Sequence, residues 1–399
     1  MKLFKSLLVA PATLGLLVPM SATANEINLT DISGYSSSEE IQSVSDFDAA
    51  KEIAVTNSRV DGLEAKFNNF EAGAFSETTT ASFSADFGIG AVQGKGTTTT
   101  VTDGNEDLEA IYGFQIDLNT SFTGEDSLDI SLDAGNNGTT SVLGELDLTG
   151  GQNAQGADLL AVDGVSYTFP LGDATIIVGD NTDGSALFNI ACTYGGGNTL
   201  DDCGTVQAGI TGGGVALGAS YDIGYGVSAA VGFQFTETGI ATEGNADSYA
   251  VNLAYSGDNY GVSYTYAALE TSGTRGLDHT DSYNAINGYY SFDNSLSVSA
   301  GYEVGALQNA TSDGADETES YFIGIDGEVG PGTLGAAYGS YGTLTESAGK
   351  MPEQNMYEIY YSYAVNDGMT ITPLIYTVEG SSATDDDETG IMVKTSFSF

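Results

Sequence analysis

The sequence predicts an all-β fold, a 16-stranded antiparallel transmembrane β-barrel over residues 76–399, preceded by a short N-terminal coiled-coil-like helix. Three observations predict it. Apolar and polar residues alternate along many short segments, short turns alternate with long polar connections, and the chain ends in an amphipathic run that closes on Phe399. A period of two indicates strands with one apolar face and one polar face, as the wall of a membrane barrel requires.

The first 24 residues have the layout of a cleaved signal peptide. Lys2 and Lys5 precede an apolar stretch over residues 7–18, and small residues at 22–24 offer a cleavage site. After this segment the chain has no apolar stretch of about 18 residues, so the mature protein has no predicted membrane-spanning helix. A membrane form must therefore be a closed barrel.

Composition agrees with a barrel and limits the partners. The mean hydropathy is -0.05, with 54 Gly, 23 Tyr, 17 Phe and no Trp, so any membrane surface must be hidden by alternation. A chain of 399 residues would also fit two soluble domains. The net charge of -46, from 55 acidic and 9 basic residues, argues against nucleic acid as a partner and makes cations the expected company.

The segment before the barrel divides into a periplasmic linker over residues 25–50 and a short coiled-coil stalk helix over residues 51–75. Apolar residues of the helix follow a heptad spacing. They are Ile53, Val60 and Phe67, with Leu63 and Phe70 offset by three. So short a coiled coil is marginal alone and would borrow stability from barrel trimerisation. A single amphipathic helix that plugs or underlies the barrel is the alternative.

The first predicted strand begins near Ala81 and shows the alternation clearly. Phe83 and Ile89 fall on one face of this segment, and Ser84 and Asp86 fall on the other. The same period recurs along the chain. Further apolar faces are Tyr112, Phe114, Ile116 and Leu118; Leu128, Ile130 and Leu132; Val165, Tyr167 and Phe169; and Val215, Leu217, Ala219 and Tyr221.

Short and long connections alternate between these strands, as periplasmic turns and outer loops do in bacterial barrels. The short connections are PLGD at 170–173, SGDN at 256–259, DN at 293–294, GPG at 330–332 and NDG at 366–368. The long connections are 93–109, 135–157, 181–213, 236–247, 269–281, 305–318, 343–354 and 380–388.

Parity fixes the strand count, because an even-numbered barrel begins and ends on the periplasmic side. It gives 16 strands, with residues 142–148 assigned to a long loop because a strand there would make 17. Pro373 falls inside the fifteenth strand, where we expect a bulge. The strand at 283–292 is ambiguous, since Asn287 interrupts one face and Gly288 the other.

A soluble β-sandwich would also show alternating strands joined by polar loops. The clustering of Tyr and Phe near strand ends and the uncharged apolar faces favour a barrel. The last segment places Ile391, Val393, Phe397 and Phe399 on one face. We identify Phe397 and Phe399 as the predicted signal for the barrel-assembly machinery.

The stretch from Arg59 to Phe87 resembles the junction between stalk and first strand in cyanobacterial outer-membrane porins, which are similar to carbohydrate-selective porins. RVDGLEAKFNNFEAG followed by FSETTTASFSADF carries the resemblance, together with the start MKLFKSLLVAPATLGLL and the end VKTSFSF. It implies a homotrimer in outer-membrane lipid that passes small ions and polar solutes. Many members grip the cell wall through an S-layer-homology domain, but residues 25–49 are too few for one, which puts cell-wall binding in doubt.

The third long loop carries the two cysteines, Cys192 and Cys203, which we expect to form a disulfide in an exported protein. The third loop of porins commonly folds into the lumen. The hypothesis is therefore a stiffened constriction that bears Asp183, Asp201 and Asp202. A disulfide-stapled outer loop is the equal alternative.

Acidic residues dominate the predicted inward faces, and Lys394 is the single base among them. The other bases of the barrel, Lys95, Arg275 and Lys350, fall in predicted outer loops. A ring of carboxylates favours cations, so we expect a modest cation preference, limited by salt screening in a wide lumen. The predicted pore-lining acids are Asp86, Asp117, Asp129, Asp133, Glu303, Asp326, Glu328 and Glu358.

Other functions find less support in the sequence. Sugar selectivity follows from the resemblance alone, since the chain has no Trp to stack on sugars and Tyr360 is the one inward aromatic identified. His279 lies in a predicted outer loop without a GxSxG motif, so an enzyme is not expected. No cofactor or metal is expected. The rival from another class is a structural envelope barrel that transports nothing.

Overall fold

A computed structural model of the chain describes residues 79–93, 108–136, 143, 146, 159–196, 200, 202–240, 242, 245–271, 279–293, 295–308, 317–342, 344–345, 354–380 and 386–399. The predicted signal peptide, linker and stalk helix lie outside the described residues. Within those residues, none of the helical structure reaches the length and apolarity that a membrane crossing needs.

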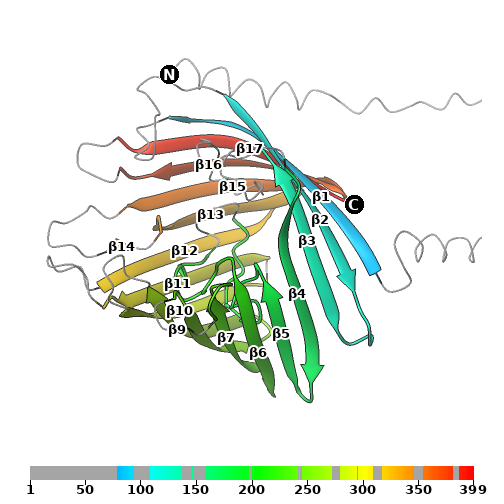
Figure 1. Cartoon of the computed structure of the whole chain (residues 1–399). Helices are drawn as coiled ribbons and strands as arrows, with labels where there is room; N and C mark the ends of the chain where they lie inside the picture. Colours follow the sequence, from blue (N-terminus) through cyan, green and yellow to red (C-terminus); the bar gives the residue numbers. More distant parts are fainter. Residues whose placement is uncertain are drawn as a thin grey trace, which may run out of the picture. The chain divides into compact units, whose positions relative to one another are not determined.

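The described residues form one antiparallel sheet that closes on itself (Figure 1). Sixteen long strands and one two-residue strand, β14, follow each other around it, which confirms the predicted count. The strands are β1 (Thr79–Gln93), β2 (Glu109–Thr120), β3 (Ser127–Gly135), β4 (Ala161–Leu171), β5 (Ala174–Asp180), β6 (Val215–Gly224), β7 (Val227–Phe235), β8 (Ser248–Ser256), β9 (Tyr260–Thr271), β10 (His279–Ser291), β11 (Leu296–Ala306), β12 (Glu317–Val329), β13 (Gly332–Ser340), β14 (Leu344–Thr345), β15 (Asn355–Asn366), β16 (Met369–Val378) and β17 (Glu388–Ser398).

The last strand closes the barrel against the first. β17 pairs with β1 from Ser84↔Ser398 to Gln93↔Thr389, and the backbone of Phe399 exchanges two hydrogen bonds with Phe83. The rings of these two phenylalanines stack with centroids 5.8 Å apart. The sequence therefore placed the closing seam correctly, and no edge strand is left open at this point.

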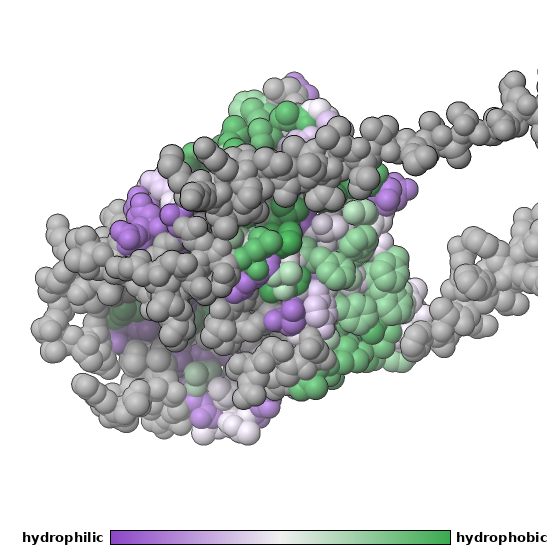
Figure 2. Space-filling view, turned by 90° about the horizontal axis from the view of Figure 1, so that it is seen from above, coloured by the Kyte–Doolittle hydropathy of each residue, from purple (hydrophilic) through white to green (hydrophobic). Residues whose placement is uncertain are grey.

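Strand alternation sorts the side chains onto two surfaces. On β8 and β9, Val251, Leu253 and Tyr264 are exposed on the outside, whereas Asn252 and Thr265 between them are buried on the inside. Figure 2 shows hydrophobic residues over a broad part of the described outer surface. The outside is thus apolar and the inside polar, which is the arrangement that period-two sequences predict for a barrel in lipid.

Two local predictions about strands can be compared with the structure. The predicted bulge at Pro373 is wrong: the register between β15 and β16 is the same at Tyr360↔Leu374 and Tyr363↔Ile371, and it shifts only between Ala364 and Asn366. Proline removes one ladder donor, whereas a register slip would turn every following side chain to the other face. The ambiguous segment forms β10 without interruption.

Two predicted loop positions can also be compared with the strand bounds. His279 is the first residue of β10 and pairs with Thr271, so it does not lie in the outer loop where the sequence placed it. Of residues 142–148, the structure describes Leu143 and Leu146, and these two lie between β3 and β4 and outside both strands, as the loop assignment predicts.

Candidate functional site

The third loop connects β5 and β6, and its described residues, 181–196, 200 and 202–214, lie against the inner face of the barrel (Figure 1). Its backbone bonds to polar side chains that successive strands turn inward. Four loop N–H groups donate to the wall: Gly184 to Gln234 of β7, Asn189 to Asn252 of β8, Ala191 to Ser263 of β9, and Thr193 to Ser299 of β11. Two loop carbonyls accept from it: that of Cys203 from Asn287 of β10, and that of Gly204 from Ser320 of β12. Because backbone groups buried in a protein need partners, this row fixes the course of the loop.

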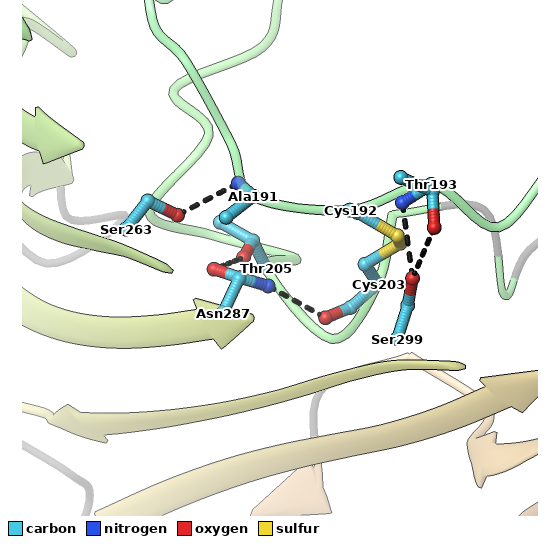
Figure 3. The surroundings of a disulfide bond; sticks show 8 residues. All are labelled: Ala191, Cys192, Thr193, Cys203, Thr205, Ser263, Asn287 and Ser299. Atoms are coloured by element: carbon cyan, nitrogen blue, oxygen red, sulfur yellow. Dashed lines mark hydrogen bonds between the residues drawn. A yellow bond between two sulfur atoms is a disulfide. The ribbon is translucent and has the colours of Figure 1, made fainter. Parts of the chain in front are cut away.

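A disulfide joins Cys192 and Cys203, as the sequence predicted. It closes a small ring within the third loop, across a sequence separation of 11. Figure 3 shows Ser263, Asn287 and Ser299 reaching from the wall to the loop on both sides of the sulfur atoms. The stapled segment is therefore also fastened to the barrel, at points that come from three different strands.

Tyr194 anchors the middle of the third loop. Its ring is 6% exposed and packs against Phe322 and Tyr360, with centroids 5.3 and 5.7 Å away. Its hydroxyl donates to Oε1 of Glu358 on β15 at 2.7 Å. Burial first, and then the Glu358 carboxylate, raise the pKa of Tyr194 well above its ordinary value. The hydroxyl thus stays protonated and remains a hydrogen-bond donor.

Glu303 on β11 fastens the end of the same loop. Its carboxylate is buried, at 1% exposure, and accepts hydrogen bonds from Gln207 N at 3.1 Å and Ala208 N at 2.8 Å. Hydrogen bonds to a charged acceptor are stronger than neutral ones. The Glu303 carboxylate therefore binds the third loop and is not exposed to solvent.

Two described residues of a second connection also lie inside the barrel. Leu143 and Leu146, between β3 and β4, are 0% and 2% exposed and belong to an apolar cluster with Tyr194 of the third loop. The inward side chains of this cluster come from strands on both sides of the closing seam. They include Val92, Ile111, Met356, Leu374, Val378 and Met392. Apolar packing therefore fills part of the interior.

Next to the strands of this cluster, the inner wall of β3 and β4 borders open space. A cavity of about 470 Å³ lies between the third loop and strands β3 and β4. Asp129, Asp163 and Asp183 line it, and Ser131, Ser166 and Thr182 add hydroxyl groups. We call this space the acidic cavity. Its lining can favour cations and polar solutes over anions.

The structure distributes the sequence-predicted acids over several settings. Asp86 of β1 and Asp117 of β2 lie on the inward face, where Asp117 accepts from Gln115 and Ser131. Asp133 is 2% exposed, whereas Glu328 is exposed. Asp326 is half-buried on β12, Asp129 lines the acidic cavity, and Glu303 and Glu358 bind the third loop.

The remaining predicted site residues lie as follows. Lys394 is inward on β17, across from Gly88, and is the single Lys or Arg in the part of the chain that the structure describes. Oδ1 of Asp183 accepts from Gly212 N at 3.0 Å, and Asp202 is exposed beside the disulfide. Asp201 lies outside the described residues. Phe397 packs edge-on against Phe87 at the closing seam.

Sequence reasoning missed the polar row that holds the third loop. Gln234, Asn252 and Ser320 gave no signal beyond being polar at inward positions. Asn287 was noticed only as an interruption of an otherwise clean face. A buried amide among small inward residues is the signal that could have been followed, since such a group needs a partner from outside its own sheet.

Comparison with known proteins places the fold. No family model matches the chain, and no curated protein matches it. Among solved structures, a mutant of the Rh. blastica porin aligns with a TM-score of 0.54 at 15% identity, over 80% of this chain and 100% of that one. OprB of Pseudomonas putida, in a high-pH structure, aligns with a TM-score of 0.56 at 13% identity, over 81% of this chain and 94% of that one. These likenesses show the 16-stranded barrel fold of porins.

Proposed function

We propose that the protein is an outer-membrane porin that lets small hydrophilic solutes and ions cross by passive diffusion. One observation carries the proposal: a closed barrel with an apolar outer surface holds the third loop against its inner wall and leaves an acidic cavity between that loop and strands β3 and β4. A barrel whose interior is partly filled by a loop is a narrowed channel, since the polar wall that remains can conduct water and ions.

Membrane insertion is supported by the outer surface and by the ends of the chain. Exposed aromatic and aliphatic side chains such as Phe87, Leu253 and Ile323 cover the outside. Phe399, at the seam, is 77% exposed and offers the terminal aromatic of the predicted assembly signal. We further propose a homotrimer, on the ground of the resemblance to cyanobacterial porins, whose members are the expected relatives.

The passage is expected to prefer cations modestly. Asp129, Asp163 and Asp183 line the acidic cavity, and Asp86 and Asp117 lie inward on neighbouring strands. Lys394 is the single base that the described inner wall offers against them. At physiological salt the field of these carboxylates is screened beyond roughly 8 Å, so the preference stays modest in a wide passage.

Conductance in planar bilayers tests this function. Purified full-length protein should produce discrete channels, and reversal potentials in a salt gradient should have the sign of cation preference. A correctly folded barrel that does not conduct would identify a structural envelope protein instead. Anion preference would contradict the assignment of the acidic cavity.

The disulfide is expected to stiffen the constriction. Replacing Cys192 and Cys203 together by Ser should alter unit conductance or gating, because the segment between them loses a covalent closure. Unchanged conductance and gating in the double variant would mean that the stapled ring does not constrict the passage. Carbohydrate uptake remains the alternative from the resemblance, and competition of maltodextrins or simple sugars with ion current would favour it.

A further inference from the structure

We propose that the inner wall of β10, β11 and β12 forms a seat for the turn Cys203–Ala208, and that the depth of this seat sets how far the third loop projects into the passage. The inference rests on the proposed pore function. Four wall residues make up the seat, and the strand register brings them together: Asn287 opposite Gly301, and Glu303 opposite Ser320.

Gly301 gives the seat its depth. A Cβ added there would lie 1.8 Å from the carbonyl oxygen of Cys203 and 2.6 Å from Nδ2 of Asn287. Even alanine would therefore push the turn off the wall by more than 1 Å, since ordinary contacts begin near 3.4 Å. The absence of a side chain is what lets the loop backbone reach the strand.

Polar groups on both sides of Gly301 hold the turn in place. Asn287 donates to the Cys203 carbonyl at 2.8 Å and accepts from the Thr205 hydroxyl at 2.8 Å (Figure 3). Ser320 donates to the Gly204 carbonyl at 2.7 Å. The Glu303 carboxylate accepts hydrogen bonds from the N–H groups of Gln207 and Ala208. Both the donors and the acceptors of the turn therefore have partners on the strands.

The seat and the disulfide have different tasks. Both cysteines belong to the third loop, so their bond ties the loop to itself and leaves its distance from the wall unset. The seat residues belong to the strands and set that distance. Changes in the seat residues are therefore expected to alter the mean conductance, because the width of the passage depends on the position of the third loop.

Gly301→Ala is the primary test. We expect its unit conductance to fall by about a fifth or more, because the displaced turn narrows the passage. Gly209→Ala, in the same loop, is the matched control: its Cβ would meet only atoms at 3.5 and 3.7 Å, so wild-type conductance is expected. Heat-modifiable migration on gels verifies that each barrel is folded.

Glu303→Gln tests the hold of the seat without changing its shape. Charge-assisted hydrogen bonds are roughly twice as strong as neutral ones, so the turn should be held more weakly in this variant, and its open-channel current noise at neutral pH should exceed that of the wild type. Protonation removes the same negative charge, so wild-type noise should rise on acidification towards the level of the variant, whose noise stays constant. A merely structural role would not produce this convergence.

Other titratable groups near Glu303 provide the control. Tyr283 and Asp281 of β10 face the same part of the interior, whereas β12 presents Thr318 and Ser320 and the loop presents backbone N–H groups. Asp281→Asn should keep the acid response of the wild type. If it abolishes the response and Glu303→Gln does not, the assignment to Glu303 is wrong.

The outcomes separate this inference from the proposed function. A folded wild type without conductance refutes the pore itself. A conducting wild type, together with a folded Gly301→Ala variant of equal conductance, overturns the seat alone. If Gly301→Ala does not fold, Glu303→Gln decides: noise and acid response equal to the wild type overturn the seat.

Discussion

Two regions of the inner wall, which we call the loop half (β11 and β15) and the cavity half (β3 and β4), carry the same kind of residue and use it differently. Glu303 and Glu358, on β11 and β15, are 1% and 4% exposed and bind the third loop. Asp129 and Asp163, on β3 and β4, line a cavity of about 470 Å³. A carboxylate that meets loop donors fastens the constriction, whereas one that meets open space sets the field in the passage.

The number of charged residues on the inward faces therefore does not equal the number of charges that permeating ions meet. Alternation places a residue on the inner face, but the inserted loop decides whether solvent reaches it. The half under the loop is held by contacts from outside the sheet. The half at the cavity meets the two ends of the third loop, but its carboxylates line open space.

The largest effect is expected on the cavity side. Changing Asp129, Asp163 and Asp183 together to Asn should remove most of the cation preference, with a permeability ratio that approaches about one. Reversal potentials at low salt, where the Debye length is roughly 30 Å at 0.01 M, make the change easiest to measure.

The matched variant lies on the loop side. Changing Glu303 and Glu358 together to Gln removes two carboxylates but should leave the permeability ratio near that of the wild type, because both are buried beneath the loop. Equal losses of selectivity in the two variants would show that both halves face the permeating ions, and the comparison would fail.

The next effect concerns stability on the loop side. Tyr194→Ala removes a buried ring from its contacts with Phe322 and Tyr360, and we expect a loss of about 3 kcal/mol in the free energy of unfolding. Tyr194→Phe keeps the ring but deprives Glu358 of a donor, for a loss of about 2 kcal/mol. Denaturant unfolding in detergent measures both.

The pH dependence of this contact has a definite sign. The pKa of Tyr194 is raised, so its contribution to stability is complete below the ordinary pKa of 10.0 and is lost only as pH rises through the raised value. The stability difference between wild type and Tyr194→Phe should therefore stay constant from neutral pH to about pH 10. A difference that shrinks over this range would contradict a buried, protonated hydroxyl.

Much of the fold could be predicted because local rules determine it. Period-two alternation and the parity of turns gave 16 strands, and the closing seam at Phe399 followed from them. The disulfide followed from two cysteines in an exported chain. The bulge expected at Pro373 failed because one lost hydrogen bond costs less than a change of register along the rest of the strand.

The site was predicted only in part, since its contacts join residues far apart in sequence. Glu303 and Asp129 look alike in an alternating strand, and nothing within either strand says which of them meets the loop. The partner of Glu303 lies 95 residues away at Ala208, and that of Glu358 lies 164 residues away at Tyr194. Such pairings depend on where the third loop stands, which the strand pattern does not encode.

The smallest effect is expected at the turn that supports the cavity side. Asp126, between β2 and β3, accepts from the Tyr167 hydroxyl of β4 and from the backbone and side chain of Thr123. These hydrogen bonds, that of Tyr167 foremost, hold the pKa of Asp126 well below its ordinary value. The Asp126 carboxylate therefore connects the turn between β2 and β3 to strand β4.

Asp126→Asn should loosen this turn and leave the loop side unchanged. Because the pKa of Asp126 is depressed, its contribution is present above the ordinary value of 3.8 and is lost only as pH falls through the lowered one, so wild type should not loosen between pH 7 and about 4. Amide hydrogen exchange at Phe122 and Thr123 should speed up in the variant, while exchange at Gln207 and Ala208 stays at the wild-type rate. Glu125→Gln, next to it and exposed, is the control with no expected change. Faster exchange at Gln207 would mean that the two halves are mechanically coupled, and it would contradict the claim that their contacts stabilise them independently.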